Sequence, residues 1–187
     1  MKGDATKLRR AALRLVGAVG EEDCAVIGAL AMAIYGHVRA TTDVHLVTRV
    51  PLPEVVKRLK ALGVRCALRH GDKIEGDFPL VRGVIGGVAF DVLPPLVHVE
   101  WDNTETLPIG GGEALRVVGP ATLIDLKLRA GGPQDVLDVV MLVLRRPEML
   151  APARKLAAAY RLADQFEAFL NAPRVRAKVP KSARRRS

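Results

Sequence analysis

The fold is constrained most by a short apolar segment that runs into a glycine turn, followed by a strand that begins with a carboxylate. The apolar residues up to Ile27 are followed by Gly28 and Ala29, and a polar stretch leads from there to Asp43 and His45. Side chains alternate along a strand, so Asp43 and His45 project from the same face, roughly 7 Å apart. The sequence therefore predicts a strand and turn next to a second strand that carries an acid and an imidazole side by side.

Hydrophobic periodicity along the rest of the chain changes between helix and strand patterns. Residues 5–19 have the apolar spacing of an amphipathic helix, and the runs at 80–85 and 88–93, separated by Gly86-Gly87, predict a β-hairpin. From Pro120 onward the helical period continues to about residue 170, which predicts a C-terminal helical section. Further expected elements are helices at residues 30–35 and 55–62 and strands at residues 24–27, 44–47, 64–68, 96–101 and 113–118.

Positive charge is concentrated at the C-terminal end. The formal charge of the chain is +9, and residues 173–187 contain seven basic residues and no acidic one, which leaves +2 for the remainder. We expect three segments: a core with an N-terminal helix at residues 1–118, the helical section at 119–172, and a disordered basic tail at 173–187. Residues 174–186 are interpreted either as part of a solubilising end or as an electrostatic binding site for RNA.

The composition is that of a globular protein with no membrane association. Hydrophobic residues make up 49% of the chain, and no stretch approaches the roughly 18 consecutive apolar residues that a membrane-spanning helix needs. Arg9, Arg10 and Arg14 interrupt the apolar part of the N-terminus, which favours an amphipathic helix over a signal peptide, so we expect a cytoplasmic protein. Cys24 and Cys66 lack the CxxC spacing and are predicted to be reduced thiols.

Charged residues further along the chain add to the motif formed by Gly28, Asp43 and His45. Asp91 is a lone carboxylate within an apolar strand, and Lys127 precedes Asp135 and Asp138 in the helical section. With the turn at residues 28–29 and the stretch at 39–45, they resemble the nucleotidyltransferase superfamily, in particular the abortive-infection (AbiEii-type) toxin nucleotidyltransferases and small bacterial relatives. The resemblance covers about residues 24–142. It implies an α/β (α+β) fold, with a mixed β-sheet flanked by helices.

The resemblance also implies a role for each matching residue. Asp43 and Asp91 would be the catalytic carboxylates and, with His45, would bind the divalent cation, Mg²⁺ or Mn²⁺. The substrate would be a nucleoside triphosphate, from which a nucleoside monophosphate is transferred to an acceptor such as RNA, tRNA or a protein. The residues that match nucleotide-binding positions are Gly28, Ala29, Arg39, Thr42 and Lys127.

One substitution departs seriously from the family pattern. His45 stands where the second metal-binding aspartate is expected, and Mg²⁺ prefers oxygen ligands, whereas imidazole suits Zn²⁺, Fe or Ni. His45 could still ligate Mn²⁺ or Zn²⁺ with the two aspartates. The alternatives are a transferase with an altered metal site, or a catalytically lapsed module that binds a nucleotide or a protein partner in a toxin–antitoxin-type system. Modification of a small hydroxylated compound such as an antibiotic is a weaker third hypothesis.

Several of these residues also have simpler structural interpretations. A buried acid in a strand needs a partner, so Asp91 could form a hydrogen bond or an ion pair instead of binding a metal. Arg39 could be a solvated loop cation, and Lys127 could be an exposed surface residue. Asp135 and Asp138 are predicted to be mainly structural, because Asp135 lies at the start of a helix where a carboxylate is stabilising.

Overall fold

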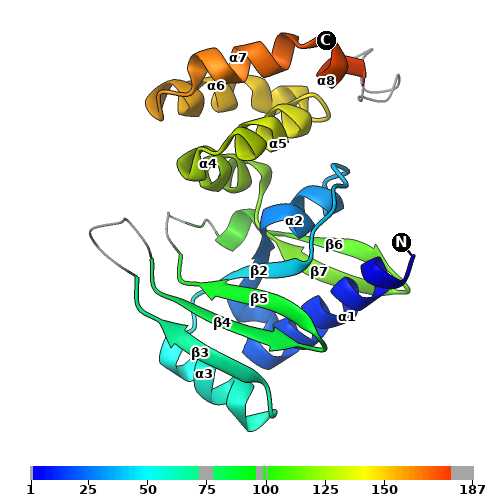
Figure 1. Ribbon diagram of the computed structural model, residues 1–187, viewed down its shortest axis with the longest axis vertical. Coiled ribbons are helices and arrows are strands. Elements are labelled where there is room, and N and C mark those ends of the chain that lie inside the picture. Colours follow the sequence, from blue (N-terminus) through cyan, green and yellow to red (C-terminus); the bar gives the residue numbers. More distant parts are fainter. Residues whose placement is uncertain (1, 72–77, 96–98, 100, 178–187) are drawn as a thin grey trace. The chain divides into compact units, whose positions relative to one another are not determined.

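The computed structural model describes residues 2–71, 78–95, 99 and 101–177, and the chain divides into two compact units (Figure 1). The sheet unit comprises Met1–Ile34 and Arg39–Val118, and the helical unit comprises Tyr35–Val38 and Gly119–Ser187. Each unit has its own set of buried apolar side chains. A four-residue segment from the first part of the chain thus belongs to the helical unit.

A seven-stranded mixed β-sheet forms the sheet unit, in the order β3-β4-β5-β2-β1-β7-β6. The pairs β2–β5 and β1–β7 are parallel, and the other neighbours are antiparallel. This sheet and the eight helices of the described residues confirm the expected α/β class. The strands are β1 (Cys24–Ile27), β2 (Asp43–Thr48), β3 (Arg65–Arg69), β4 (Leu80–Ile85), β5 (Val88–Leu93), β6 (Glu105–Gly110) and β7 (Glu113–Val117).

The strand expected at residues 96–101 falls mostly on residues that the structure does not describe. Residues 96–98 and 100 lie outside the described residues, and Trp101 begins a short 3₁₀ helix, Trp101–Asn103. One of the two edge strands of the sheet is β6, which the apolar pattern did not predict. β6 has no fully buried side chain and includes Pro108, so its sequence lacks the signal of a buried strand.

Two helices cover one face of the sheet. α1 (Lys2–Val19) packs on β1, β2, β4 and β5, and α3 (Leu52–Ala61) packs on β3 and β4 (Figure 1). The opposite face carries Asp43 and His45, and α2 (Gly28–Ile34) lies against β1, β2 and β6 there. Fully buried side chains between the sheet and α1 and α3 are Leu15, Val19, Leu46, Val55, Leu59, Val81 and Phe90, each of which contributes about 1.5–3 kcal/mol.

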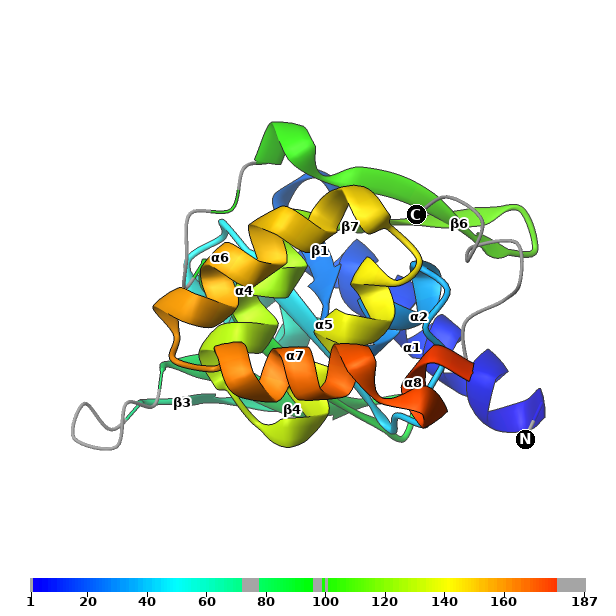
Figure 2. The same cartoon turned by 90° about the horizontal axis from the view of Figure 1, so that it is seen from above.

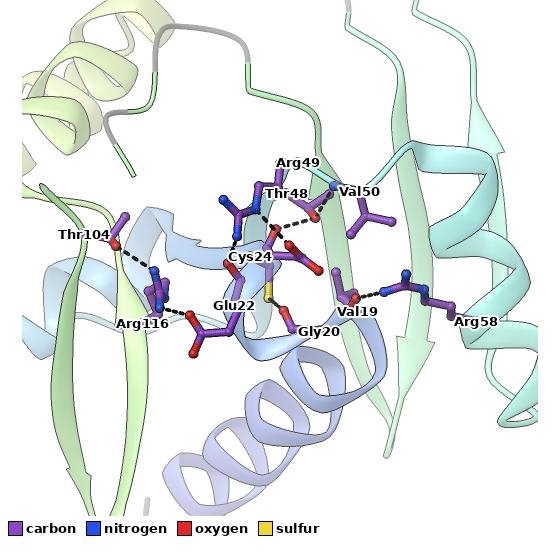
Figure 3. Close-up of polar contacts among 11 residues, drawn as sticks. Val19, Gly20, Glu22, Cys24, Thr48, Arg49, Val50, Arg58, Thr104 and Arg116 are labelled. Carbon is purple, nitrogen blue, oxygen red and sulfur yellow. Dashed lines mark hydrogen bonds and ion pairs between the residues drawn. The ribbon is translucent and has the colours of Figure 1, made fainter. Parts of the chain in front are cut away.

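Polar contacts surround the start of β1 (Figure 3). Arg49, just after β2, donates from Nε to Asp23 Oδ1 at 2.8 Å. Arg58 of α3 donates from Nη1 to the Val19 carbonyl at 2.5 Å, at the C-terminal end of α1, where helix carbonyls lack partners within the helix. Gly28 follows the other end of β1. This network therefore stabilises the end of the strand that is remote from the glycine turn.

Five short helices form the described part of the helical unit, with α5 in contact with both α4 and α7 (Figure 2). Gly131 ends α4 in the left-handed conformation, with φ 68°, and its N–H bonds the Lys127 carbonyl at 3.1 Å, a common glycine C-cap. Pro133 then begins the next helix. The helices are α4 (Pro120–Ala130), α5 (Pro133–Val143), α6 (Leu150–Ala159), α7 (Ala163–Asn171) and α8 (Pro173–Ala177).

Three further expectations concern the chain as a whole. No helix in the described ranges is both long and apolar enough to cross a membrane. Cys24 and Cys66 are unpaired thiols, as predicted. The expected basic tail begins as helix α8, and residues 178–187, which carry most of its charge, lie outside the described residues.

Candidate functional site

Strand pairing aligns three polar side chains across the middle of the sheet. His45 of β2 lies opposite Asp91 of β5, and Asp91 lies opposite Arg82 of β4. Directly paired residues point to the same face of a sheet, so the three side chains share the face opposite α1 and α3. Asp43 joins them, because it lies two residues before His45 on β2.

The two acids and the imidazole are close enough to interact directly. His45 Nε2 is 3.2 Å from Asp43 Oδ2 and 3.8 Å from Asp91 Oδ2. Asp91 is the least accessible of the three, with 14% of its side chain exposed against 35% for His45 and 43% for Asp43. Thr41 Oγ1 donates to Asp43 Oδ1 at 2.7 Å and so orients that carboxylate. The structure thus brings the three side chains together, while their catalytic and metal-binding roles remain predictions.

The turn between β1 and α2 adjoins this group. Gly28 has φ +68°, in the left-handed region that favours glycine. A Cβ atom at this position would lie 3.2 Å from His45 Nδ1, closer than ordinary van der Waals contact. Ala29 follows, and its side chain is buried. Glycine at position 28 is therefore favoured both by the backbone conformation and by the imidazole beside it.

Arg82, which is not among the predicted site residues, pairs with Asp91 through two hydrogen bonds. Its Nε donates to Asp91 Oδ1 and its Nη2 donates to Asp91 Oδ2, each at 2.8 Å. A planar guanidinium matches a carboxylate in this way, and such charge-assisted bonds are roughly twice as strong as neutral ones. An ion pair is one of the simpler roles expected for this strand carboxylate. The signal that could have identified Arg82 is the register of the predicted hairpin.

The side chains of this group do not fit a pair of magnesium ions. Mg²⁺ requires oxygen ligands in near-octahedral geometry, but one candidate ligand is an imidazole and both oxygens of Asp91 accept from Arg82. In the part of the chain that the structure describes, no group of three or more His, Cys, Asp or Glu side chains is arranged to hold a metal ion. The Mg²⁺ or Mn²⁺ cofactor therefore remains an implication of the resemblance, and we assign no chemical step to it.

Arg39 and Thr42 lie on the segment that leads into β2. Arg39 is half-buried, and its Nη1 donates to the Ala40 carbonyl at 3.4 Å. Thr42 is exposed and directly precedes Asp43. Both residues are thus close in sequence to the acid of the site, and their contact with a nucleotide stays a prediction.

Lys127 belongs to a buried ion cluster of the helical unit. Its Nζ donates to Asp135 Oδ1 at 2.6 Å and lies 2.9 Å from Asp138 Oδ2. Only 10% of its side chain is accessible, so the alternative of an exposed surface residue is wrong. The two aspartates hold the amine, which is the structural role expected of them. Two of the three N–H groups of the amine are therefore directed at aspartates, and contact between Lys127 and a nucleotide stays a prediction.

Asp138 is the centre of that cluster and is fully buried. Its Oδ1 accepts from His37 Nε2 at 3.2 Å and from Gln134 Nε2 at 2.8 Å. Burial raises the pKa of the Asp138 carboxyl, but the hydrogen bonds from His37, Lys127 and Gln134 outweigh it and hold the pKa well below its usual range. Because His37 lies on the segment Tyr35–Val38, this contact attaches that segment to the helical unit.

No family model and no curated protein matches the sequence. Solved structures do match the fold. ANT(2'')-Ia in complex with adenylyl-2''-tobramycin has a TM-score of 0.57 and 16% identity, covering 84% of this chain and 96% of that one. A Thermotoga maritima protein provisionally assigned as a nucleotidyltransferase has a TM-score of 0.54 and 13% identity, covering 82% and 94%. A Helicobacter pylori protein of the same provisional assignment has a TM-score of 0.50 and 13% identity, covering 96% and 87%. At these identities the likeness concerns the fold, and this chain has the fold found in nucleotidyltransferase structures.

Proposed function

We propose that this protein is a diverged relative of the nucleotidyltransferases that binds a nucleoside triphosphate and transfers its nucleotide slowly. The observation that carries the proposal is the meeting of the Gly28 turn, Asp43, His45 and Asp91 on one face of the sheet. The shared fold supports the same assignment.

The triphosphate is assigned to the Gly28-Ala29 turn. Small residues at a turn let phosphate oxygens approach the backbone N–H groups, which bind anions there. In the reaction, an acceptor hydroxyl oxygen bonds to the α-phosphorus, the bond to the bridging oxygen breaks, and pyrophosphate leaves. The hydroxyl proton passes to a carboxylate, for which we assign Asp43, the more accessible of the two candidate acids.

Two features of the site predict a low rate. His45 replaces a carboxylate that the resemblance implies, and Arg82 neutralises Asp91 through two hydrogen bonds. Two-metal enzymes stabilise the attacking and leaving oxygens of an in-line displacement with cations held by carboxylates. Because these side chains do not fit such a pair, less stabilisation of the transition state is expected here.

Nucleotide binding is tested first, by thermal unfolding with ATP, CTP, GTP and UTP in EDTA, Mg²⁺ or Mn²⁺. A ligand at a hundred times its Kd stabilises the folded state by about 2.7 kcal/mol, so at least one nucleotide should raise the melting temperature. Gly28→Ala should weaken this effect. Gly17→Ala is the matched control, because a Cβ at that position in α1 meets no neighbouring atom within 4 Å. Absence of a shift with all four nucleotides in all three conditions would refute the proposal.

Transfer is tested with radiolabelled nucleoside triphosphates and total RNA. We expect slow incorporation that disappears in Asp43→Ala and increases in His45→Asp, since the latter restores the carboxylate of the family pattern. Incorporation that persists in Asp43→Ala would remove this site as its source.

The second candidate is a catalytically lapsed module that binds a nucleotide or a protein partner, as in a toxin–antitoxin-type system. The Arg82–Asp91 pair favours it, since this pair engages both oxygens of one candidate catalytic acid. Nucleotide binding without transfer, in both the wild type and His45→Asp, would support this candidate over a slow enzyme.

RNA is the acceptor class that we propose for an active enzyme, because the C-terminal tail is strongly basic. One structural neighbour was solved with adenylyl-2''-tobramycin, so a small hydroxylated compound is the alternative acceptor. Radiolabel transferred to RNA and not to added tobramycin would support RNA as the acceptor, and the opposite result would support the small compound.

A further inference from the structure

Asp91 is the most enclosed acid of the candidate site, and it is also the most completely satisfied. Only 14% of its side chain is accessible, and each carboxylate oxygen accepts a hydrogen bond from Arg82 at 2.8 Å. His45 Nε2 lies further away, at 3.8 Å from Asp91 Oδ2. The dominant partner of this carboxylate is therefore the guanidinium.

The strand register makes the Arg82–Asp91 pair a built-in feature of the sheet. Arg82 and Asp91 are directly opposite on β4 and β5, which are joined by the Gly86-Gly87 turn, so no loop has to bring them together. The arginine side chain is 60% exposed whereas the acid is enclosed. Removing the guanidinium should consequently free both Asp91 oxygens from these two hydrogen bonds without opening the hydrophobic core.

We propose that Arg82 closes this site to divalent cations by occupying the position of a cation at Asp91. Without Arg82, Asp43, His45 and Asp91 would offer two carboxylates and one imidazole on a single face. An imidazole in the set favours Mn²⁺ and Zn²⁺ over Mg²⁺. Arg82 thus controls whether Asp91 is available to a metal ion, a role that neither the fold nor the predicted site residues reveal.

The test measures metal binding by the full-length protein with no nucleotide present. Mn²⁺ is titrated into the wild type, Arg82→Gln and Arg69→Gln, and free Mn²⁺ is followed by electron paramagnetic resonance. Arg69 is the matched control, because it is an exposed arginine on the same sheet face, on the edge strand β3. An exposed ion pair is worth up to about 1 kcal/mol, so Arg82→Gln should bind Mn²⁺ roughly fivefold more tightly than the wild type. Arg69→Gln should stay within about twofold.

Two further variants establish that the gain passes through Asp91. Arg82→Lys keeps the charge but cannot form the bidentate contact with Asp91, so its affinity for Mn²⁺ should lie between those of the wild type and Arg82→Gln. Asp91→Asn in the Arg82→Gln background should abolish the gain. Equal Mn²⁺ affinity in the wild type and in both Arg82 variants, or a gain that survives Asp91→Asn, would overturn the proposal. If Arg82→Gln fails to give the circular dichroism spectrum of the wild type, Arg82→Lys serves for the same comparison.

This inference rests on the proposed function only for the identity of the site, and the two fail separately. Loss of the Mn²⁺ effect leaves nucleotide binding by the wild type untouched. Conversely, Arg82→Gln can still bind Mn²⁺ more tightly when the wild type binds none of the four nucleotides.

Discussion

Replacing Asp138 with alanine is expected to lower the free energy of unfolding by about 3 kcal/mol. Its carboxylate is fully buried and is held by His37, Lys127 and Gln134. Removing one partner of a buried ion pair costs about 3–5 kcal/mol, because the other charge remains without compensation. Lys127 keeps Asp135, at 2.6 Å, as a second partner. The cost is therefore placed at the lower end of that range.

The measurement is urea unfolding followed by circular dichroism, with Asp135→Ala as the matched control. Asp135 bonds the same amine but is 25% exposed, so its replacement should cost only about 1 kcal/mol. Asp138→Asn keeps the shape and loses the charge, and should fall between the two alanine variants. If Asp138→Ala cost no more than Asp135→Ala, the buried cluster would not have the stabilising role argued here.

The same variants predict a pH dependence with a definite sign. The pKa of Asp138 is lower in the folded protein than in the unfolded chain, so its contribution to stability is complete above the unfolded value, about 3.9. The contribution is lost as pH falls through the lower, folded pKa. The stability difference between wild type and Asp138→Asn should thus be constant from pH 7 to about pH 5 and shrink below about pH 4. A difference that widened on acidification would contradict this reasoning.

Three further predictions concern single features. Burial raises the pKa of Cys24 to about 12 and also raises the pKa of Cys66, so both thiols should react slowly with alkylating reagents at pH 8. Cys24 is fully buried and should be modified only on unfolding. Early labelling of Cys24 in the folded protein, detected by mass spectrometry, would contradict this. Gly28→Ala should lower the free energy of unfolding by about 1–2 kcal/mol, because alanine is strained at positive φ, whereas Gly17→Ala in α1 should be neutral or stabilising in the same denaturation assay. Truncation after Ala177 keeps α8 and removes five basic residues. If the protein binds RNA, the slope of log affinity against log salt concentration should become shallower by roughly 3.5. An unchanged slope would show that the tail does not contact the RNA.

The gathering of Asp43 and His45 could be predicted because it depends on local geometry alone. Two residues on one strand share a face whatever the rest of the fold does. The glycine turn was predictable for the same reason, since small residues after a buried strand favour a tight change of direction. The position of Asp91 could not be predicted from local geometry, because its place beside β2 depends on the order of the strands in the sheet. The family resemblance implied only that Asp91 lies on a strand next to the one that carries Asp43.

The burial of Lys127 could not be predicted from the period of its own helix. On α4 it lies between Leu126 and Leu128, and a charged side chain is usually exposed unless it is paired. Its partners Asp135 and Asp138 are on α5, and the chain reverses between the two helices at Gly131. Only the packing of α4 against α5 places the acids over the amine. A lysine followed by two acids across a short glycine link is thus a sequence signal for a buried ion cluster.

Arg82 could have been found by counting along the hairpin. Gly86 and Gly87 both have positive φ, as a two-residue turn of the type that joins β-strands requires, and Ile85 pairs with Val88 across them. Three steps outward from that pair reach Arg82 on one strand and Asp91 on the other. The count uses only the turn position and the strand period, so it needs no structure. In a chain of this fold, that count identifies the residue opposite the strand acid. If this residue is a cation, the protein itself neutralises the acid. If it is not, the acid is left available to bind a metal ion.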